Sequence, residues 1–148
     1  DSFYKSLKNL GYRALQELKR AERYSEFVSV ILIDLEQWEK NLSPEERETL
    51  FYLNWEKDLV NLLKKRIRET DIASGLENNK LALLLTETSP EGAKVLAKRL
   101  TEEIKLFFQT QGNSDLQLKS LMNIVSFPDK ERGKEQFLHL VQALRANK

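Results

Sequence analysis

Apolar residues recur every three or four positions in several stretches of the chain, the spacing of a helix with one buried face. These stretches are residues 2–23, 44–68, 90–108 and a closing segment after the charged turn at 130–134. The second of them starts with a capping box, in which Ser43 is the N-cap and Glu46 stands three positions later. The pattern therefore predicts helices in these stretches.

The first predicted helix has its apolar residues along one side. Ser2 is placed to cap it. The members of the stripe are Phe3, Leu7, Leu10, Ala14 and Leu18. The stripe fits two interpretations: a helix packed on its own domain, or the end of a signalling helix or coiled coil from an upstream domain.

Other stretches have the shorter, denser apolar runs that are typical of strands. Residues 26–36 (EFVSVILIDLE) are nearly continuously apolar, which predicts a central strand buried on both faces. Residues 71–74 and 81–85 predict two strands joined by a polar turn at Gly75–Asn79. Residues 116–127 predict a further strand, because Pro128 follows it directly.

In chain order the predicted elements read α-β-α-β-β-α-β-α, with the second and third strands joined directly. That direct connection excludes a simple doubly wound parallel sheet. It indicates an α+β sandwich with the β-α-β-β-α-β core of ferredoxin-like and palm-type domains. We expect an antiparallel-containing central sheet with helices on one face, plus an N-terminal and a C-terminal helix. Residues 1–148 are treated as one domain, with 1–24 as a signalling-type helix and 25–148 as the core.

Composition excludes several classes of function. The chain has no cysteine, which removes thiol catalysis, disulfides and thiolate metal sites, and its single histidine makes a histidine-rich metal site untenable. The net charge of +1 gives no attraction to nucleic acid or to an anionic membrane, and the longest apolar runs are too short to span a bilayer. Because the chain opens without an initiator methionine or a signal-peptide pattern, we expect a domain cut from a longer cytoplasmic protein.

Polar side chains with candidate chemistry lie at the end of the central strand and in the turn. Asp34 ends the strand, where a carboxylate can bind a metal or a ligand, although a lone one more often simply ends a strand. The turn carries Glu77, Asn78 and Asn79 but no cluster of metal ligands. His139 lies off the stripe of the last helix and is interpreted as a surface residue.

Separated segments match, in order and spacing, the motifs of a known family. Residues 18–24 (LKRAERY) lead into the strand that carries Asp34 near its end, residues 68–74 read RETDIAS, and residues 120–128 (SLMNIVSFP) place Asn123 in the strand predicted at 116–127. Together they resemble the GGDEF domain, the diguanylate cyclase fold. In that family, R-A-x-R-Y precedes a strand ending D-x-D-x-F, R-x-x-D precedes the signature, and glycine is usual where Asn123 stands. The match covers nearly the whole chain.

The signature itself is absent. Counting from Asp71, the positions of Gly-Gly-Asp/Glu-Glu-Phe are held by Glu77, Asn78, Asn79, Lys80 and Leu81. In such a cyclase, carboxylates of this hairpin and of the first strand hold two divalent metals, which activate one GTP for attack on another. The glycines let a nucleotide approach the backbone closely.

The replacements conflict with that chemistry. Asn79 is a weak ligand for magnesium, Lys80 brings a positive charge to the supposed metal site, and Asp34 remains as a lone carboxylate. Leu42 stands near the position of the asparagine that reads guanine in the family. The resemblance therefore implies a domain without cyclase activity, catalytic residues, a bound metal or another cofactor.

What survives is the pair Arg68 and Asp71, which matches the family's R-x-x-D inhibitory site for cyclic di-GMP. A guanidinium can bind guanine or phosphate oxygens, and a carboxylate can accept the guanine N–H groups. The same pair is equally explained by a local ion pair beside a helix end.

Two classes of function follow. In the first, the chain is a catalytically inactive GGDEF-like receptor for cyclic di-GMP through Arg68 and Asp71. In the second, it is an interaction or dimerisation module that binds no nucleotide. Its partner surface would then be the altered hairpin Gly75–Lys80 or the stripe of the N-terminal helix.

Overall fold

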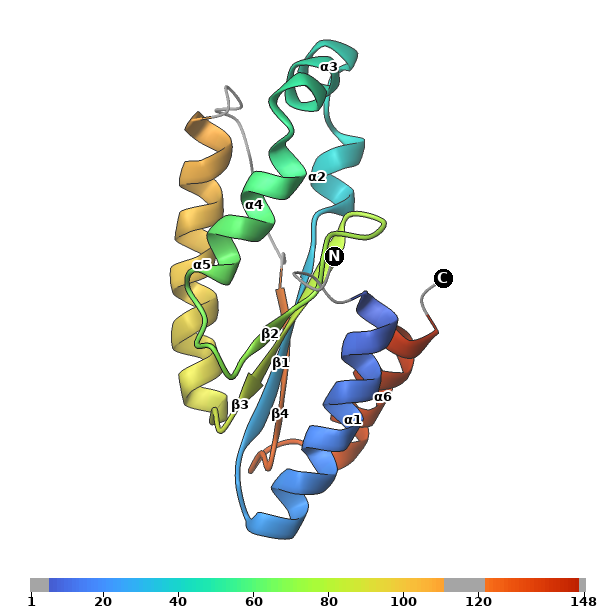
Figure 1. Cartoon of the computed structure of the whole chain (residues 1–148), viewed down its shortest axis with the longest axis vertical. Helices are drawn as coiled ribbons and strands as arrows, with labels where there is room; N and C mark the ends of the chain where they lie inside the picture. Colours follow the sequence, from blue (N-terminus) through green and yellow to red (C-terminus); the bar gives the residue numbers. More distant parts are fainter. Residues whose placement is uncertain (1–5, 111–121, 147–148) are drawn as a thin grey trace.

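The computed structural model describes residues 6–110 and 122–146. These residues form one four-stranded sheet with helices packed on both of its faces (Figure 1). The elements in chain order are α1 (Leu7–Tyr24), β1 (Val28–Asp34), α2 (Glu36–Lys40), α3 (Pro44–Leu53), α4 (Trp55–Lys64), β2 (Ile72–Ala73), β3 (Lys80–Thr86), α5 (Pro90–Thr110), β4 (Met122–Phe127) and α6 (Lys134–Arg145). No helix in the described ranges is both long and apolar enough to cross a membrane.

The sheet has the strand order β2-β3-β1-β4, and every neighbouring pair is antiparallel. The predicted central strand is β1, which pairs with β3 from Val28 opposite Thr86 to Asp34 opposite Lys80. Its other neighbour is β4. The mixed helix and antiparallel-sheet architecture and the direct β2–β3 connection are thus confirmed. The predicted strand at 116–127 is observed from Met122 onward, and its first residues lie outside the described ranges.

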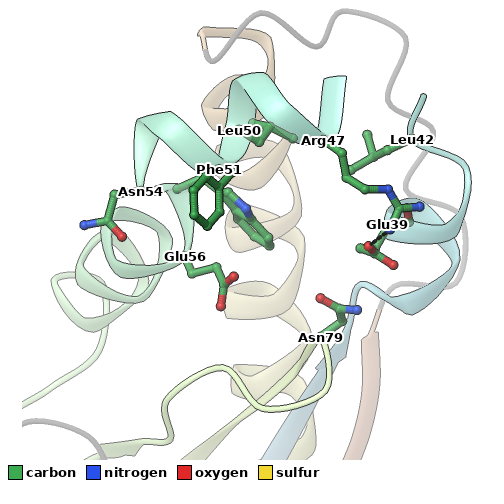
Figure 2. A pocket seen from close by; sticks show the side chains of 9 residues that line it. Glu39, Leu42, Arg47, Leu50, Phe51, Asn54, Glu56 and Asn79 are labelled. Atoms are coloured by element: carbon green, nitrogen blue, oxygen red, sulfur yellow. Dashed lines mark hydrogen bonds and ion pairs between the residues drawn. The ribbon is translucent and has the colours of Figure 1, made fainter. Parts of the chain in front are cut away.

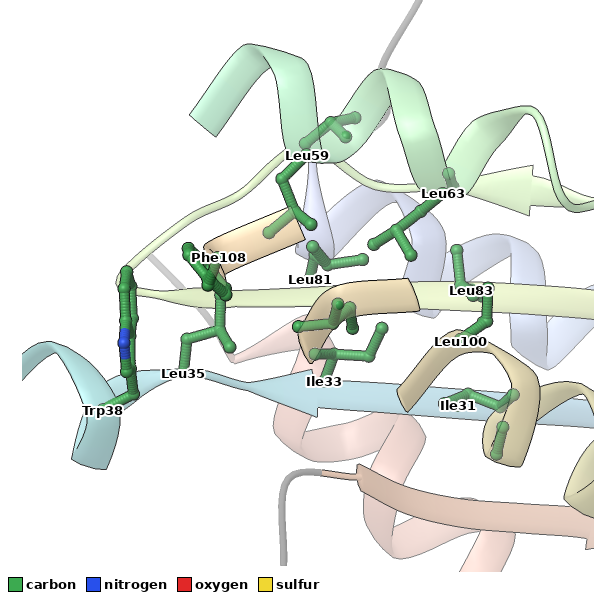
Figure 3. Close-up of a cluster of buried hydrophobic side chains, with 14 of the residues drawn as sticks. Ile31, Ile33, Leu35, Trp38, Leu59, Leu63, Leu81, Leu83, Leu100 and Phe108 are labelled. Atoms are coloured by element: carbon green, nitrogen blue, oxygen red, sulfur yellow. The ribbon is translucent and has the colours of Figure 1, made fainter. Parts of the chain in front are cut away.

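Each face of the sheet has its own apolar core, because both sets of alternating residues in β1 and β3 are apolar. On one face, Ile31, Ile33, Leu81 and Leu83 pack against α4 and α5 through Leu59, Leu63, Leu100 and Phe108 (Figure 3). On the other face, Val30, Ala82 and Leu84 pack against α1 and α6 through Leu10, Ala14, Phe137 and Val141. The helices α4 and α5, which connect strands, thus lie on one face as expected, and the N- and C-terminal helices α1 and α6 cover the other.

Helix α1 covers much of that second face of the sheet. Within the described residues, its stripe from Leu7 to Leu18 is buried, so the helix packs on its own domain. It begins at Leu7 and is capped by Ser6, whose Oγ accepts a hydrogen bond from the Asn9 N–H at 3.0 Å. The predicted cap at Ser2 lies outside the described residues.

The prediction of a single helix over 44–68 is wrong, because this stretch forms the two helices α3 and α4. The helix is interrupted at Asn54, which has a left-handed backbone with φ 53° and separates α3 from α4. On one straight helix, Leu50 and Leu59 would lie about 180° apart and could not both face the sheet. The break allows both side chains to be buried. Glu36, which was assigned to the end of the strand, instead begins the short helix α2.

Candidate functional site

The hairpin between β2 and β3 closes in a two-residue turn. Glu77 and Lys80 exchange backbone hydrogen bonds of 2.8 and 2.9 Å. Between them, Asn78 and Asn79 both have left-handed backbones, with φ 51° and 62°. Positive φ at both central residues is the mark of a type I′ turn, and asparagine tolerates it well. The predicted turn at Gly75–Asn79 thus narrows to these two asparagines, and Leu81 is buried in β3.

The end of β1 lies beside this hairpin, as the resemblance implied. Asp34 is opposite Lys80 in the sheet, and the Leu35 N–H donates to the Asn79 carbonyl at 2.7 Å. The Asp34 carboxylate accepts a hydrogen bond from the Glu36 N–H at 2.9 Å, so it caps the turn into α2. The structure therefore brings the strand end and the altered signature positions together.

Lysines surround the second carboxylate at this end of the sheet. Glu36 lies 3.5 Å from the ammonium group of Lys40 and 3.5 Å from that of Lys80. The charge of Lys40, and after it that of Lys80, lowers the pKa of Glu36 below its ordinary value. Each lysine favours the ionised carboxylate.

The donor set at this place does not fit a pair of divalent metals. Asp34 supplies the carboxylate on β1, and the positively charged Lys80 lies opposite it in the sheet. The neighbouring Glu36 is already paired with two lysines. Over residues 6–110 and 122–146, no three histidine, aspartate or glutamate side chains come together as a metal site. A metal brought here would meet a positive charge and too few oxygen ligands.

Glu77 makes a contact that sequence reasoning missed. Its Oε1 accepts a hydrogen bond of 2.6 Å from the backbone N–H of Leu7, the first residue of α1. A carboxylate at this point satisfies a free N–H group of the helix and lies at the positive end of the helix dipole. No local pattern could have revealed the contact, because 70 positions separate its partners.

A cavity opens on the hairpin side of α3 (Figure 2). Its volume is about 280 Å³. The lining residues are Glu39, Leu42, Arg47, Leu50, Phe51, Asn54, Trp55, Glu56 and Asn79. Asn79 comes from the hairpin and the others come from α2, α3, α4 and their connections. The sequence did not predict this cavity, because the break at Asn54 creates the angle between α3 and α4.

Arg68 and Asp71 lie near the other end of β3, away from the hairpin turn. The Asp71 carboxylate accepts hydrogen bonds from the backbone N–H groups of Arg68 at 2.9 Å and Thr86 at 3.0 Å. The Arg68 guanidinium lies 3.3 Å from the same carboxylate, and it also donates to the Thr86 carbonyl and, at 2.8 Å, to the Thr88 hydroxyl. The Asp71 side chain is 4% exposed and that of Arg68 is 56% exposed. The ion pair between Arg68 and Asp71 that the sequence allowed is therefore present.

His139, on α6, is exposed as expected.

Comparison with known proteins identifies the fold. No family model and no curated protein matches the sequence. Solved structures do match. The GGDEF domain of PA1120 (YfiN or TpbB) from Pseudomonas aeruginosa aligns at 18% identity over 92% of this chain and 87% of that chain, with a TM-score of 0.55. The active GGEEF domain of a diguanylate cyclase from Vibrio cholerae aligns at 15% identity over 84% and 74% of the two chains, with a TM-score of 0.52.

PelD from Pseudomonas aeruginosa aligns at 19% identity over 93% of this chain and 45% of that chain, also with a TM-score of 0.52. At these identities the likeness concerns the fold. This agrees with the segments of sequence that resemble the family. The chain has a GGDEF-like fold.

Proposed function

We propose that this chain is a non-catalytic GGDEF-like regulatory domain of bacterial signalling. The observation that carries the proposal is the engagement of the hairpin's charged side chains within the protein. Glu77 binds the first N–H of α1 at 2.6 Å, and Lys80 lies 3.5 Å from Glu36. A cyclase hairpin must present carboxylates to metal ions and leave its backbone open to a nucleotide. These side chains instead attach the hairpin to α1 and α2.

An assay of GTP turnover with magnesium tests the loss of catalysis. We expect no cyclic di-GMP from the wild-type domain under conditions in which an active GGEEF domain gives product. Turnover by the wild type that disappears in Asp34→Asn would overturn the proposal. Replacement of residues 77–80 by Gly-Gly-Glu-Glu shows whether the signature alone restores turnover.

A finer part of the proposal is that the domain binds cyclic di-GMP at Arg68. Its guanidinium is half-exposed, and its Nη1 has no hydrogen-bond partner in the described part of the chain. The Asp71 side chain is 4% exposed, and backbone N–H groups already engage both of its oxygens. We therefore assign guanine or phosphate binding to Arg68 and the positioning of its guanidinium to Asp71.

Isothermal titration with cyclic di-GMP tests this assignment. Arg68→Ala should abolish binding that the wild type shows. Arg66→Ala is the matched control, because that nearby arginine is already paired with Glu103 at 2.6 Å. Absence of heat at high micromolar ligand, or an unchanged affinity in Arg68→Ala, would contradict the assignment and leave the non-catalytic proposal in place.

The second candidate is an interaction module that needs no nucleotide, and the bond between Glu77 and α1 favours it. The stripe of α1 from Leu7 onward is buried in the domain, so the hairpin is the surface left to this hypothesis. Cross-linking of the full-length protein with residues 77–80 replaced tests it. An unchanged set of partners would argue against the hairpin.

A further inference from the structure

Helix α3 presents large apolar side chains to water. Phe51 is 77% exposed, Tyr52 is 76% exposed and Leu53 is 43% exposed, while the one buried residue of this helix is Leu50. The rings of Phe51 and Tyr52 are in edge-to-face contact, with centroids 5.7 Å apart, so they form one aromatic surface. Single exposed apolar residues are ordinary, but a contiguous group of this kind marks an interaction site.

This surface adjoins the cavity described above. Phe51 and Leu50 contribute to the cavity from α3 (Figure 2). Trp55 contributes from the start of α4. Trp55 is 7% exposed and belongs to the buried aromatic cluster with Trp38 and Phe108. A volume of about 280 Å³ is at the lower limit of small-molecule sites. It suits one large apolar side chain of a protein partner, the usual form of an interface anchor.

The surroundings of the surface are acidic. Within residues 44–58, the acidic side chains are Glu45, Glu46, Glu48, Glu56 and Asp58, and the basic ones are Arg47 and Lys57. Arg47 is already bound to Glu39. The exposed carboxylates of Glu45, Glu48, Glu56 and Asp58 have no ion-pair partner in the described part of the chain. Because the whole chain has a net charge of only +1, this is a local concentration of negative charge.

We propose that α3 and the adjoining cavity form the docking site of a basic amphipathic helix of a partner protein. One large apolar side chain of that helix enters the cavity beside Phe51 and Trp55, and its Lys or Arg residues face the carboxylates. Nucleic acid and anionic membranes do not fit, because the carboxylates repel them. A symmetric second copy would place the same acidic surface against itself. The site uses neither Arg68 nor the charged hairpin residues, so it goes beyond the function proposed above.

The test uses a fluorescently labelled synthetic helix with leucines on one face and lysines on the other. Its controls are the same helix with glutamate in place of lysine, and a scrambled peptide of identical composition. We expect saturable binding by anisotropy for the first peptide and at least ten-fold weaker binding for both controls. Binding should also change the tryptophan emission, because Trp55 lines the cavity. Salt should weaken binding, since exposed charges are screened.

Substitutions on the protein complete the test. Phe51→Ser should weaken binding at least ten-fold, and its exposure predicts an unchanged melting temperature. Val95→Ser is the matched control, because Val95 is 62% exposed on α5, and it should leave the affinity unchanged. Glu45→Lys with Glu48→Lys should reduce binding and its dependence on salt. Equal binding of the peptides, equal effects of Phe51→Ser and Val95→Ser, or a dimer that Phe51→Ser abolishes would each overturn the proposal.

Discussion

The Arg68–Asp71 pair offers the sharpest test of the structural reasoning, through the substitution Asp71→Asn. Asp71 is 4% exposed, and its two oxygens accept separate backbone hydrogen bonds, one from Arg68 and one from Thr86. An asparagine keeps one oxygen and replaces the other by an NH₂ group. That group donates, so it must face one of the two backbone N–H groups and cannot bind it.

The expected cost adds two effects. A buried N–H left without an acceptor costs about 1–3 kcal/mol. Here the Arg68 hydrogen bond is exposed and the Thr86 hydrogen bond is part-buried, so the cost falls in the lower part of that range. The ion pair with the half-exposed Arg68, at 3.3 Å, adds at most about 1 kcal/mol, because solvent screens it. We therefore expect Asp71→Asn to lower the free energy of unfolding by roughly 1–3 kcal/mol. For a domain of this size, that corresponds to a fall in Tm of roughly 2–12 °C.

Urea unfolding without added ligand measures this change, provided that the m-value stays constant. Glu69→Gln is the control, because Glu69 is an exposed neighbouring carboxylate, and it should change stability by less than about 0.5 kcal/mol. If Asp71→Asn were no more destabilising than the control, the two hydrogen bonds to Asp71 would not hold the β2–β3 edge as described. The reasoning that assigns Asp71 a positioning role would then be refuted.

Three further predictions concern packing, backbone and charge. Gly11→Ala should lower stability by about 1–3 kcal/mol despite the better helix propensity of alanine, because the added Cβ would lie 2.9–3.1 Å from atoms of α6; thermal melts measure this. Asn54→Ala should cost about 1–2 kcal/mol in chemical unfolding, whereas Asn54→Gly should not, because the position has φ 53°. Lys40→Gln should raise the pKa of Glu36 more than Lys80→Gln does, as NMR titration would show. Since the pKa is lowered in the folded state, the stability that Glu36 contributes is present above its unfolded pKa and disappears as the pH falls through the folded value, and either substitution moves that loss to higher pH.

Local patterns in the sequence predicted much of this fold correctly. The capping box at Ser43 is formed as expected, with the Ser43 N–H bound to the Glu46 carboxylate at 2.9 Å and the Glu46 N–H bound to the Ser43 hydroxyl at 3.1 Å. The dense apolar run within residues 26–36 forms β1, which lies between β3 and β4 in the sheet. Arg68 and Asp71 were identified as a possible ion pair, and they lie 3.3 Å apart. The capping box and the ion pair each join residues three positions apart, and the apolar run of β1 is itself a local signal.

Long-range features were beyond that reasoning. The apolar spacing of 44–68 was read as one helix, because Leu50 and Leu59 each fit a helical stripe when they are considered separately. Only the apolar core that both side chains join requires the left-handed break at Asn54. The cavity and the exposed aromatic surface of α3 both follow from that break. Likewise, helices cover both faces because α1 and α6 pack together against the second face, which no single stripe indicates.

The hairpin keeps its backbone shape without the glycines of the signature. A type I′ turn needs two residues that accept positive φ, and Asn78 and Asn79 meet that need as glycine would. The register of β3 against β1 therefore does not depend on the family's glycines. Chemistry depends instead on the side chains that flank the turn. A carboxylate serves a metal only while its oxygens remain available, and a hydrogen bond from a helix N-terminus competes for them. The bond from the Leu7 N–H to Glu77 holds the hairpin against the start of α1 and occupies one carboxylate oxygen. Glu77 stands where the signature has glycine, so the proposed loss of catalysis rests on Asn79 and Lys80, which stand at the acidic positions.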